Sequence, residues 1–251
     1  MSVGVIAGIE ALESRRMFAG GMSTAGGAAF IDGATLRIVA DARRSTNVRI
    51  TTEDDGETIL VAINGRGAQA FSKETLASVL FTGGRGQDRV TVREDGGRID
   101  LPLIIRTGAG GDFVDLDETE GRVAGGDGND TLLGSSGDDR MDGEAGNDRV
   151  FGGRGFDLLR GGGGNDDIRG DDGDDTLIGE RGNDVLDGGF GSDELDGGDG
   201  RNRLVDRARR GEFNIFYGGL GRNDIFGTTT DEFRDIDHWF DRVYLSRPLN
   251  E

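Results

Sequence analysis

The sequence predicts an all-β protein built as a parallel β-solenoid, in which the chain coils repeatedly and short strands stack into sheets. Three observations support this prediction. A nine-residue phrase repeats without a gap from Gly125 to Val205. The chain has 48 glycines but only 2 prolines, which suits periodic turns better than a disordered linker or collagen. Residues 28–124 alternate apolar and polar side chains, as half-buried strands do.

The repeated phrase has glycine at positions 1 and 4 and an aliphatic residue or Met at position 8. Glycine reaches the positive φ angles that a tight turn over positions 1–6 needs. Positions 7–9 are expected to form a short strand whose position 8 points inward, because strand side chains alternate between faces. The nine phrases are GGDGNDTLL, GSSGDDRMD, GEAGNDRVF, GGRGFDLLR, GGGGNDDIR, GDDGDDTLI, GERGNDVLD, GGFGSDELD and GGDGRNRLV.

Position 6 is Asp in eight phrases and Asn202 in the ninth, which indicates metal binding. Hard cations such as calcium take oxygen ligands from carboxylates and backbone carbonyls. Two phrases form one coil, so the turns stack in two rows, and an ion would lie between turns one coil apart. The predicted ligands are Asp112, Asp130, Asp148, Asp166, Asp184 and Asn202 in the first row, and Asp139, Asp157, Asp175 and Asp193 in the second.

Neighbouring aspartates give four calcium sites in the first row and three in the second, seven in all. A weaker eighth site would join Asp184 to Asn202, because an amide ligates but carries no charge. Without metal, stacked carboxylates repel each other, and one row of small apolar residues buries little surface. We therefore expect residues 125–205 to fold on binding calcium. The competing interpretation, a disordered Gly/Asp-rich tract, does not explain the apolar residue at every position 8.

The phrase matches the pattern G-G-x-G-x-D-x-U-x, and so resembles the RTX or haemolysin-type calcium-binding nonapeptide repeat. The resemblance implies a right-handed parallel β-roll with two rows of calcium-binding turns. Proteins with this repeat include metalloproteases, lipases, pore-forming toxins and epimerases, in which the roll accompanies a separate domain that carries the chemistry.

Composition restricts the partners. The formal net charge is −19, which repels nucleic acid and attracts divalent cations. The absence of cysteine excludes disulfides and cysteine zinc sites. There is no run of about 18 apolar residues that would span a membrane. Because calcium is abundant outside cells and scarce in the cytosol, weak sites suit an exported protein. We expect the protein to be extracellular or at the cell surface.

Two segments precede the regular repeats. Residues 1–27 are expected to form a poorly ordered, export-type segment, because residues 12–19 resemble the LEPR motif of exported bacterial proteins, with Ser14 in place of proline. An amphipathic helical turn is the alternative. Residues 28–124 are expected to form an irregular β-rich solenoid with a hairpin around Asp54-Asp55-Gly56. A separate small β-sandwich is the alternative for this region.

Irregular copies of the phrase lie on both sides of the repeats. Residues 83–91 match it, but the separation of Asp88 from Asp112 exceeds two phrases, so Asp88 falls outside the register of the first row. Gly121 stands where the second row would require Asp, so that turn is expected to hold no ion. Residues 125–205 are expected to form the calcium-binding β-roll. Residues 206–251 hold the only Trp and both Tyr, and are expected to form an aromatic-rich cap over the open end. A C-terminal export signal is the other interpretation.

The sequence lacks the common catalytic patterns. Its single histidine, His238, excludes an H-E-x-x-H zinc protease, and no G-x-S-x-G nucleophile motif is present. Metal-ligand spacing already explains the paired carboxylates. We expect an exported, non-enzymatic calcium-binding protein with a structural or surface role. The alternatives are an adhesin-like module that binds a glycan or cell-surface partner, and an enzyme with an acidic cleft in residues 28–124.

Overall fold

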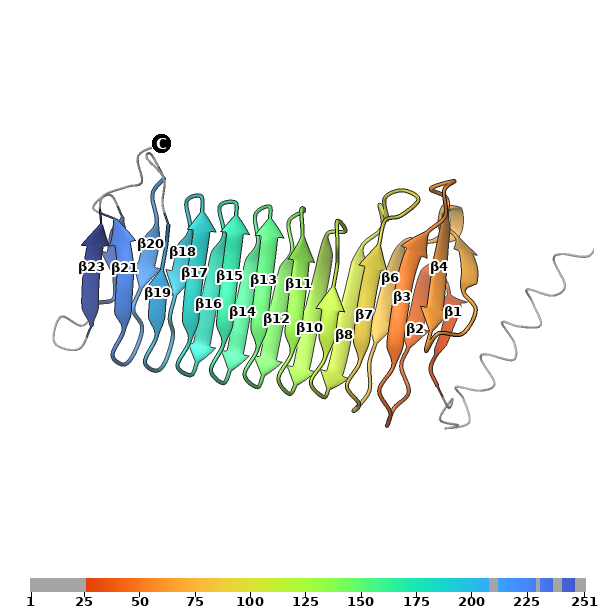
Figure 1. Cartoon of the computed structure of the whole chain (residues 1–251), viewed down its shortest axis with the longest axis horizontal. Helices are drawn as coiled ribbons and strands as arrows, with labels where there is room; N and C mark the ends of the chain where they lie inside the picture. Colours follow the sequence, from red (N-terminus) through yellow and green to blue (C-terminus); the bar gives the residue numbers. More distant parts are fainter. Residues whose placement is uncertain (1–25, 208–211, 229–230, 237–240, 247–251) are drawn as a thin grey trace, which may run out of the picture.

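A computed structural model describes residues 26–207, 212–228, 231–236 and 241–246. In this part of the chain, the predicted all-β parallel solenoid is confirmed (Figure 1). The one helical element among these residues is a 3-10 turn, Lys73–Thr75, where the sequence Ser72-Lys73-Glu74-Thr75 favours a helical turn. The described residues contain no helix with the length and hydrophobicity that a membrane crossing requires.

The strands form two sheets that run the length of the solenoid. Sheet A contains, in order, β1 (Ala28–Asp32), β2 (Thr35–Val39), β6 (Ser78–Thr82), β8 (Leu103–Ala109), β10 (Gly121–Asp127), β12 (Arg140–Ala145), β14 (Leu158–Gly163), β16 (Thr176–Arg181), β18 (Glu194–Asp196), β20 (Ile215–Tyr217) and β22 (Glu232–Arg234). Sheet B contains β5 (Gln69–Ser72), β4 (Thr58–Ile63), β3 (Asn47–Thr52), β7 (Arg89–Arg93), β9 (Phe113–Asp115), β11 (Thr131–Ser135), β13 (Arg149–Arg154), β15 (Asp167–Asp172), β17 (Val185–Phe190), β19 (Arg203–Val205), β21 (Asp224–Thr228) and β23 (Arg242–Ser246).

The repeat period sets the register between strands. Successive strands of the roll alternate between the sheets, so each strand pairs in parallel with the strand one coil away. Leu132 of β11 lies beside Val150 of β13, and Met141 of β12 lies beside Leu159 of β14. The members of each pair are two phrases apart in the sequence. The turns that join the sheets therefore also stack at intervals of one coil.

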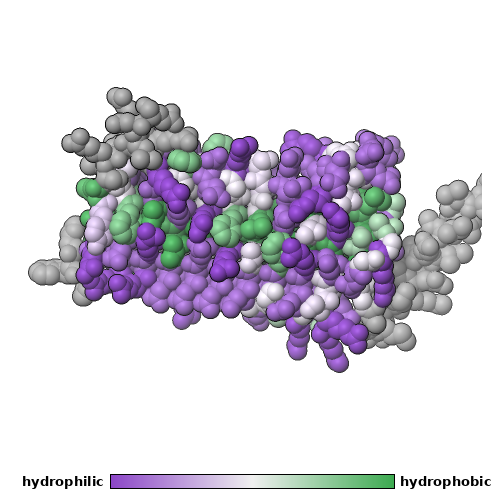
Figure 2. Space-filling model, in the orientation of Figure 1, coloured by the Kyte–Doolittle hydropathy of each residue, from purple (hydrophilic) through white to green (hydrophobic). Residues whose placement is uncertain are grey.

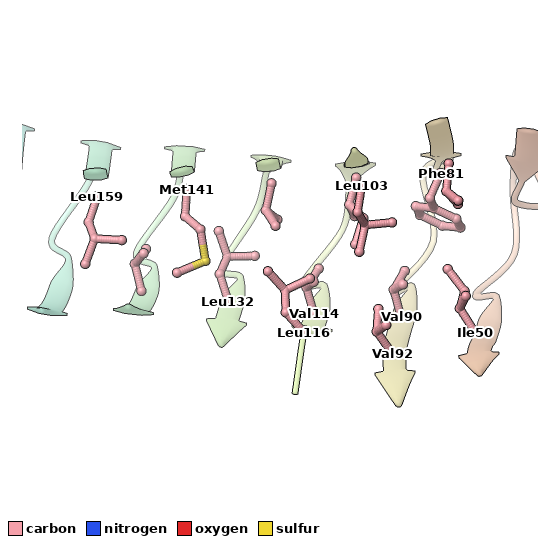
Figure 3. Packing of buried hydrophobic residues seen from close by; sticks show 14 of the residues in the cluster. Ile50, Phe81, Val90, Val92, Leu103, Val114, Leu116, Leu132, Met141 and Leu159 are labelled. Atoms are coloured by element: carbon pink, nitrogen blue, oxygen red, sulfur yellow. The ribbon is translucent and has the colours of Figure 1, made fainter. Parts of the chain in front are cut away.

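The core is a single layer of side chains between the two sheets. Position 8 points inward as predicted, and all nine residues there are 0% exposed, namely Leu132, Met141, Val150, Leu159, Ile168, Leu177, Leu186, Leu195 and Leu204. Figure 3 shows side chains from opposite sheets meeting in this layer, with Leu132, Met141 and Leu159 among them. Each nine-residue phrase thus contributes one fully buried large side chain.

The N-terminal coils belong to the same solenoid. Strand β8 pairs with both β6 and β10, and β9 pairs with both β7 and β11, so both sheets continue across residue 124. Strands β3 and β4 form the hairpin expected around Asp55, with Thr52 beside Ile59. Strand β1 pairs antiparallel with β2, and β5 pairs antiparallel with β4. The described residues thus show no separate β-sandwich. Residues 1–25, with the LEPR-like segment, lie outside the described residues.

The C-terminal aromatic region is itself built as coils. Strands β20 to β23 extend both sheets in parallel. Its rings stack between coils: Phe216 lies on Phe233 with centroids 5.3 Å apart, and Phe226 lies on Tyr244 at 4.6 Å. Leu204 pairs with Ile225, which lies more than two phrases further along the chain, so this coil is longer than those of the roll. His238 and Trp239 lie outside the described residues.

Replacing a position-8 residue should destabilise the roll strongly. In the metal-loaded protein, Leu159→Ala is expected to lower the free energy of unfolding by about 2–5 kcal/mol, because the small layer cannot collapse around the cavity. Leu158→Ala is the matched control, because Leu158 is the preceding residue and only half-buried. Thermal unfolding followed by circular dichroism measures both. Equal losses of unfolding free energy in the two variants would contradict a core to which each phrase contributes a single large side chain.

Candidate metal centres

The position-6 residues of the first row form a continuous hydrogen-bond ladder. Each residue accepts, through Oδ1, the backbone N–H of the position-6 residue one coil earlier. The N···Oδ1 distances are 2.7 Å for Asp112 to Asp130 and for Asp130 to Asp148, 2.8 Å for Asp148 to Asp166, and 2.9 Å for Asp166 to Asp184 and for Asp184 to Asn202. The structure therefore brings together all six residues that the sequence assigns to this row.

The second row has the same arrangement on the opposite turns. The Asp139 N–H donates to Asp157, Asp157 to Asp175, and Asp175 to Asp193, at 2.8, 2.9 and 2.8 Å. The row begins at Gly121, whose N–H donates to Asp139 Oδ1 at 2.7 Å but which offers no carboxylate. The first turn of this row thus has the ladder hydrogen bond but lacks the carboxylate that the other turns contain.

The carboxylates in both rows are buried, and most keep one oxygen without a partner. The ten predicted ligands are between 1% and 3% exposed. Eight of the nine aspartates have an Oδ2 atom that is buried and makes no hydrogen bond, namely Asp112, Asp130, Asp148, Asp157, Asp166, Asp175, Asp184 and Asp193. An unpaired buried carboxylate oxygen is costly, so each of these atoms needs a cation or a proton.

The turns leave room beside these oxygens. A Cβ added to Gly143, at position 1, would collide with Asp148 Oδ2 and would lie 2.6 Å from Gly161 O of the next coil. The glycine thus keeps open a space between a carboxylate oxygen and a backbone carbonyl. Gly125, Gly152 and Gly170 hold the same relation to Asp130, Asp157 and Asp175. Position 1 is glycine because any side chain would fill this space.

Backbone carbonyls would have to supply most of the ligands. Among the described residues there is no group of three or more Asp, Glu or His side chains placed to hold one metal ion. A bound ion would therefore combine carboxylate oxygens of stacked aspartates with carbonyl oxygens of the two turns. Oxygen-only donor sets of this kind suit calcium.

Burial also shifts the protonation of the rows. It raises the pKa of Asp130, Asp157 and Asp184 to about 7, and that of Asp193 to about 8. The hydrogen bond to Oδ1 lowers each pKa, and the neighbouring carboxylates raise it further. Without a cation, the fold favours protonated carboxyl groups.

Position 5 adds a second ladder to the first row. Asn147 donates its backbone N–H to Asn129 Oδ1 at 2.8 Å, Asn165 donates to Asn147 at 2.7 Å, and Asn183 donates to Asn165 at 2.8 Å. These exposed side chains hold successive turns in line. They leave the interior of each turn to the glycine carbonyls and the aspartate.

Both rows continue beyond the residues that the sequence assigns to them. Asp88 accepts the Thr46 N–H at 2.7 Å, and its own N–H donates to Asp112 Oδ1 at 2.6 Å. The irregular spacing concealed this link, since the extra residues of that coil lie away from the turn. At the other end, Asn223 and Asp241 extend the first row, and Asn214 and Asp231 the second. The phrase at residues 218–226 indicated Asn223, whereas Asn214 and Asp231 lack a clear phrase.

A scan against family models matches residues 122–150, 143–177 and 169–204 to the RTX calcium-binding nonapeptide repeat, a model of four copies. The chain carries RTX calcium-binding repeats. The resemblance read from the phrase is thereby confirmed, and calcium is the cation that RTX repeats imply. Searches of curated proteins and of solved structures found no match for the chain.

The metal-free RTX repeats should lose structure as the pH rises. Burial raises the pKa of Asp148, Asp130 and Asp193 to about 6, 7 and 8, whereas an unfolded Asp has a pKa of about 3.9, so raising the pH favours the unfolded chain. Metal-stripped protein is therefore expected to show more strand signal by circular dichroism at pH 5.5 than at pH 8. With calcium the order should reverse, because protons compete with the ion. If the metal-free protein showed more strand signal at pH 8 than at pH 5.5, the row carboxylates would not be buried with raised pKa values.

Proposed function

We propose that this protein is an exported, non-enzymatic calcium-binding protein whose RTX repeats fold into a rigid rod when calcium fills the two rows of turns. The observation that carries the proposal is the set of eight buried aspartate oxygens without a partner. Asp112, Asp130, Asp139, Asp148, Asp157, Asp166, Asp175, Asp184, Asp193 and Asn202 are the proposed ligands. Neighbouring aspartates offer seven sites, and Asp184 with Asn202 offers a weaker eighth.

The donor set fits calcium better than other common cations. The rows contain no Cys or His that would favour zinc or copper. Magnesium prefers a compact octahedral site that retains several waters, whereas calcium accepts more ligands at longer distances. Bound calcium supplies positive charge between stacked carboxylates, which removes their repulsion. The residues themselves orient the site, because each Oδ1 is fixed by a backbone N–H and only Oδ2 faces the open space.

The negative charge of the chain and the low calcium concentration of the cytosol both support export. The formal net charge is −19, and many of the carboxylates lie on the turns, so divalent ions would relieve a large self-repulsion. Because calcium is scarce in the cytosol, the rows would stay empty there and fill outside the cell. A rod that forms only after export suits a structural role at or beyond the cell surface.

An enzymatic role has little support outside the repeats. A hollow of about 540 Å³ lies beside β8 and β10 and is lined by Glu94, Arg98, Asp100 and Glu120, among others. Glu94 already accepts hydrogen bonds from the Ile99 N–H at 2.7 Å and the Thr119 hydroxyl at 3.0 Å. Arg98 lies 3.9 Å from Asp100. Two of the three carboxylates in this hollow thus already have partners, so it does not favour an acid–base reaction.

The apolar band on sheet B supports a structural role more than adhesion. Figure 2 shows this band along the face that sheet B presents. The Arg89 guanidinium lies over the Phe113 ring at 3.8 Å, and Arg203 lies over Phe226 at 5.0 Å. The Phe226 ring also stacks on the ring of Tyr244. These contacts tie adjacent coils together.

Removing calcium should unfold the repeats. Addition of EGTA to the full-length protein is expected to abolish most of the strand signal from residues 112–202, and calcium should restore it. Isothermal titration should detect at least about five ions per chain. Magnesium at the same concentration is the control and should not restore the signal. Unchanged circular dichroism in EGTA, or fewer than about four bound calcium ions, would refute the two-row arrangement.

A further inference from the structure

Both ends of the two rows differ from the middle in one respect. At the end turns, a hydrogen-bond donor of the protein binds either the carboxylate oxygen or the backbone carbonyl that interior turns leave for an ion. We propose that these donors replace calcium, so that the ends of the solenoid fold without metal and only the interior coils depend on it. This inference rests on the proposed function, because it divides the calcium rows into turns that need the ion and turns that do not.

At the N-terminal end of the first row, Asp88 is fully satisfied by the backbone. Its Oδ1 accepts the Thr46 N–H at 2.7 Å, and its Oδ2 accepts the Gly84 N–H at 3.1 Å. The side chain is 2% exposed, so these two bonds give both oxygens of a buried carboxyl group a protein partner. Asp88 has the same place in the ladder as the predicted ligands, but neither of its carboxylate oxygens lacks a hydrogen-bond partner.

The next turn contains a side chain in place of the position-1 glycine. Thr107 stands there, fully buried, and its hydroxyl donates to Gly125 O of the following coil at 2.6 Å. In the interior, glycine leaves this space open between the carboxylate and that carbonyl. The Thr107 side chain therefore occupies the space that interior turns leave open and satisfies the Gly125 carbonyl, while Oδ2 of Asp112 makes no hydrogen bond.

The second row starts with another hydroxyl. Ser135 donates to Asp139 Oδ2 through both its hydroxyl, at 2.9 Å, and its backbone N–H, at 2.8 Å. Oδ1 of Asp139 accepts the Gly121 N–H at 2.7 Å. Asp139 is accordingly the one predicted aspartate whose Oδ2 is not left unpaired. Its turn is complete without metal.

Amides take the same role at the C-terminal end. The Asn202 side-chain amide donates to Gly197 O at 2.7 Å, and that of Asn223 donates to Gly218 O at 2.6 Å. In each case the amide nitrogen binds the carbonyl of its own position-1 glycine. In the second row, the Asn214 amide donates to Asp206 and to Asp231. An NH2 group thus stands where interior turns have an unpaired carboxylate oxygen.

Five sites remain that have a carboxylate on both sides and no donor of this kind. Three lie in the first row, between Asp130 and Asp148, Asp148 and Asp166, and Asp166 and Asp184. Two lie in the second row, between Asp157 and Asp175 and between Asp175 and Asp193. In each, Oδ2 of the first aspartate is unpaired and position 1 of its turn is glycine. Asp184 and Asp193 also face Asn turns, where we infer weaker sites.

Apolar burial supports the same division. The N-terminal coils bury two or three large side chains from most strands, including Leu36 and Ile38 of β2, Val48 and Ile50 of β3, and Val79 and Phe81 of β6. The interior strands bury one each. Apolar area can stabilise the N-terminal coils in the way that ions stabilise the interior. In a solenoid, each new coil then adds to a folded neighbour, so residues 26–109 serve as a template for the calcium-dependent coils.

Hydrogen–deuterium exchange of the full chain, with EGTA and with calcium, tests the division. We expect amides of β2, β3, β6 and β7 to be protected in both conditions, and amides of β13 to β16 to be protected only with calcium. Rapid exchange of the N-terminal strands in EGTA would overturn this inference but leave calcium-dependent folding intact. Protection of β13 to β16 in EGTA would overturn the proposed function itself.

Two reciprocal substitutions test the donors directly. Asn202→Asp removes the amide that binds Gly197 O and adds a carboxylate, so titration should detect one more strong calcium site and β19 should lose protection in EGTA. Asp166→Asn introduces an amide that can bind Gly161 O, so fewer ions should bind and β15 should gain protection in EGTA. If both variants bind as many ions as the parent protein, with the same exchange in EGTA, the donors do not replace calcium.

Discussion

The structure depends on one constraint, which is that each interior turn buries a carboxylate oxygen for which the protein supplies no partner. Oδ1 of each aspartate is held by a backbone N–H of the previous coil, and this bond fixes Oδ2 inside the turn. Because glycine at position 1 keeps the adjacent space open, the turn is shaped to take a cation. A coil of this kind gains little from its core, since each strand contributes one buried side chain.

This constraint links stability to the surroundings. The same burial that raises the pKa of Asp157 to about 7 also makes the turn a good ligand for a divalent ion. At the proposed sites, protons and calcium therefore compete for the same oxygens, and we expect the metal-free roll to be less stable than the calcium-bound roll at neutral pH. We propose that the end coils escape this dependence through hydroxyl, amide and backbone donors. The solenoid thus combines two ways of satisfying the same turn geometry.

Much of the fold could be read from the repeat. The period of two phrases per coil specified the parallel register, and position 8 specified the core, because both depend on local spacing alone. The ten predicted ligand positions also followed from the period, and the structure places all of them in the two ladders. The link between Asp88 and Asp112 could not be read in this way, since a longer coil conceals a ladder bond that only the folded chain reveals. Asn214 was missed for a related reason, because the coil that separates it from Asp193 is also longer than two phrases.

The sequence by itself determined the period, the turn chemistry and the ion class, because a glycine turn with an aspartate in nearly every phrase permits few other structures. It did not determine which aspartates are left unpaired. That was decided by tertiary structure, since the donors to the turns come from residues whose effect depends on orientation, such as the Ser135 hydroxyl on Asp139 and the Asn202 amide on Gly197. A serine or an asparagine in a repeat looks like ordinary variation until its hydrogen-bond partner is known.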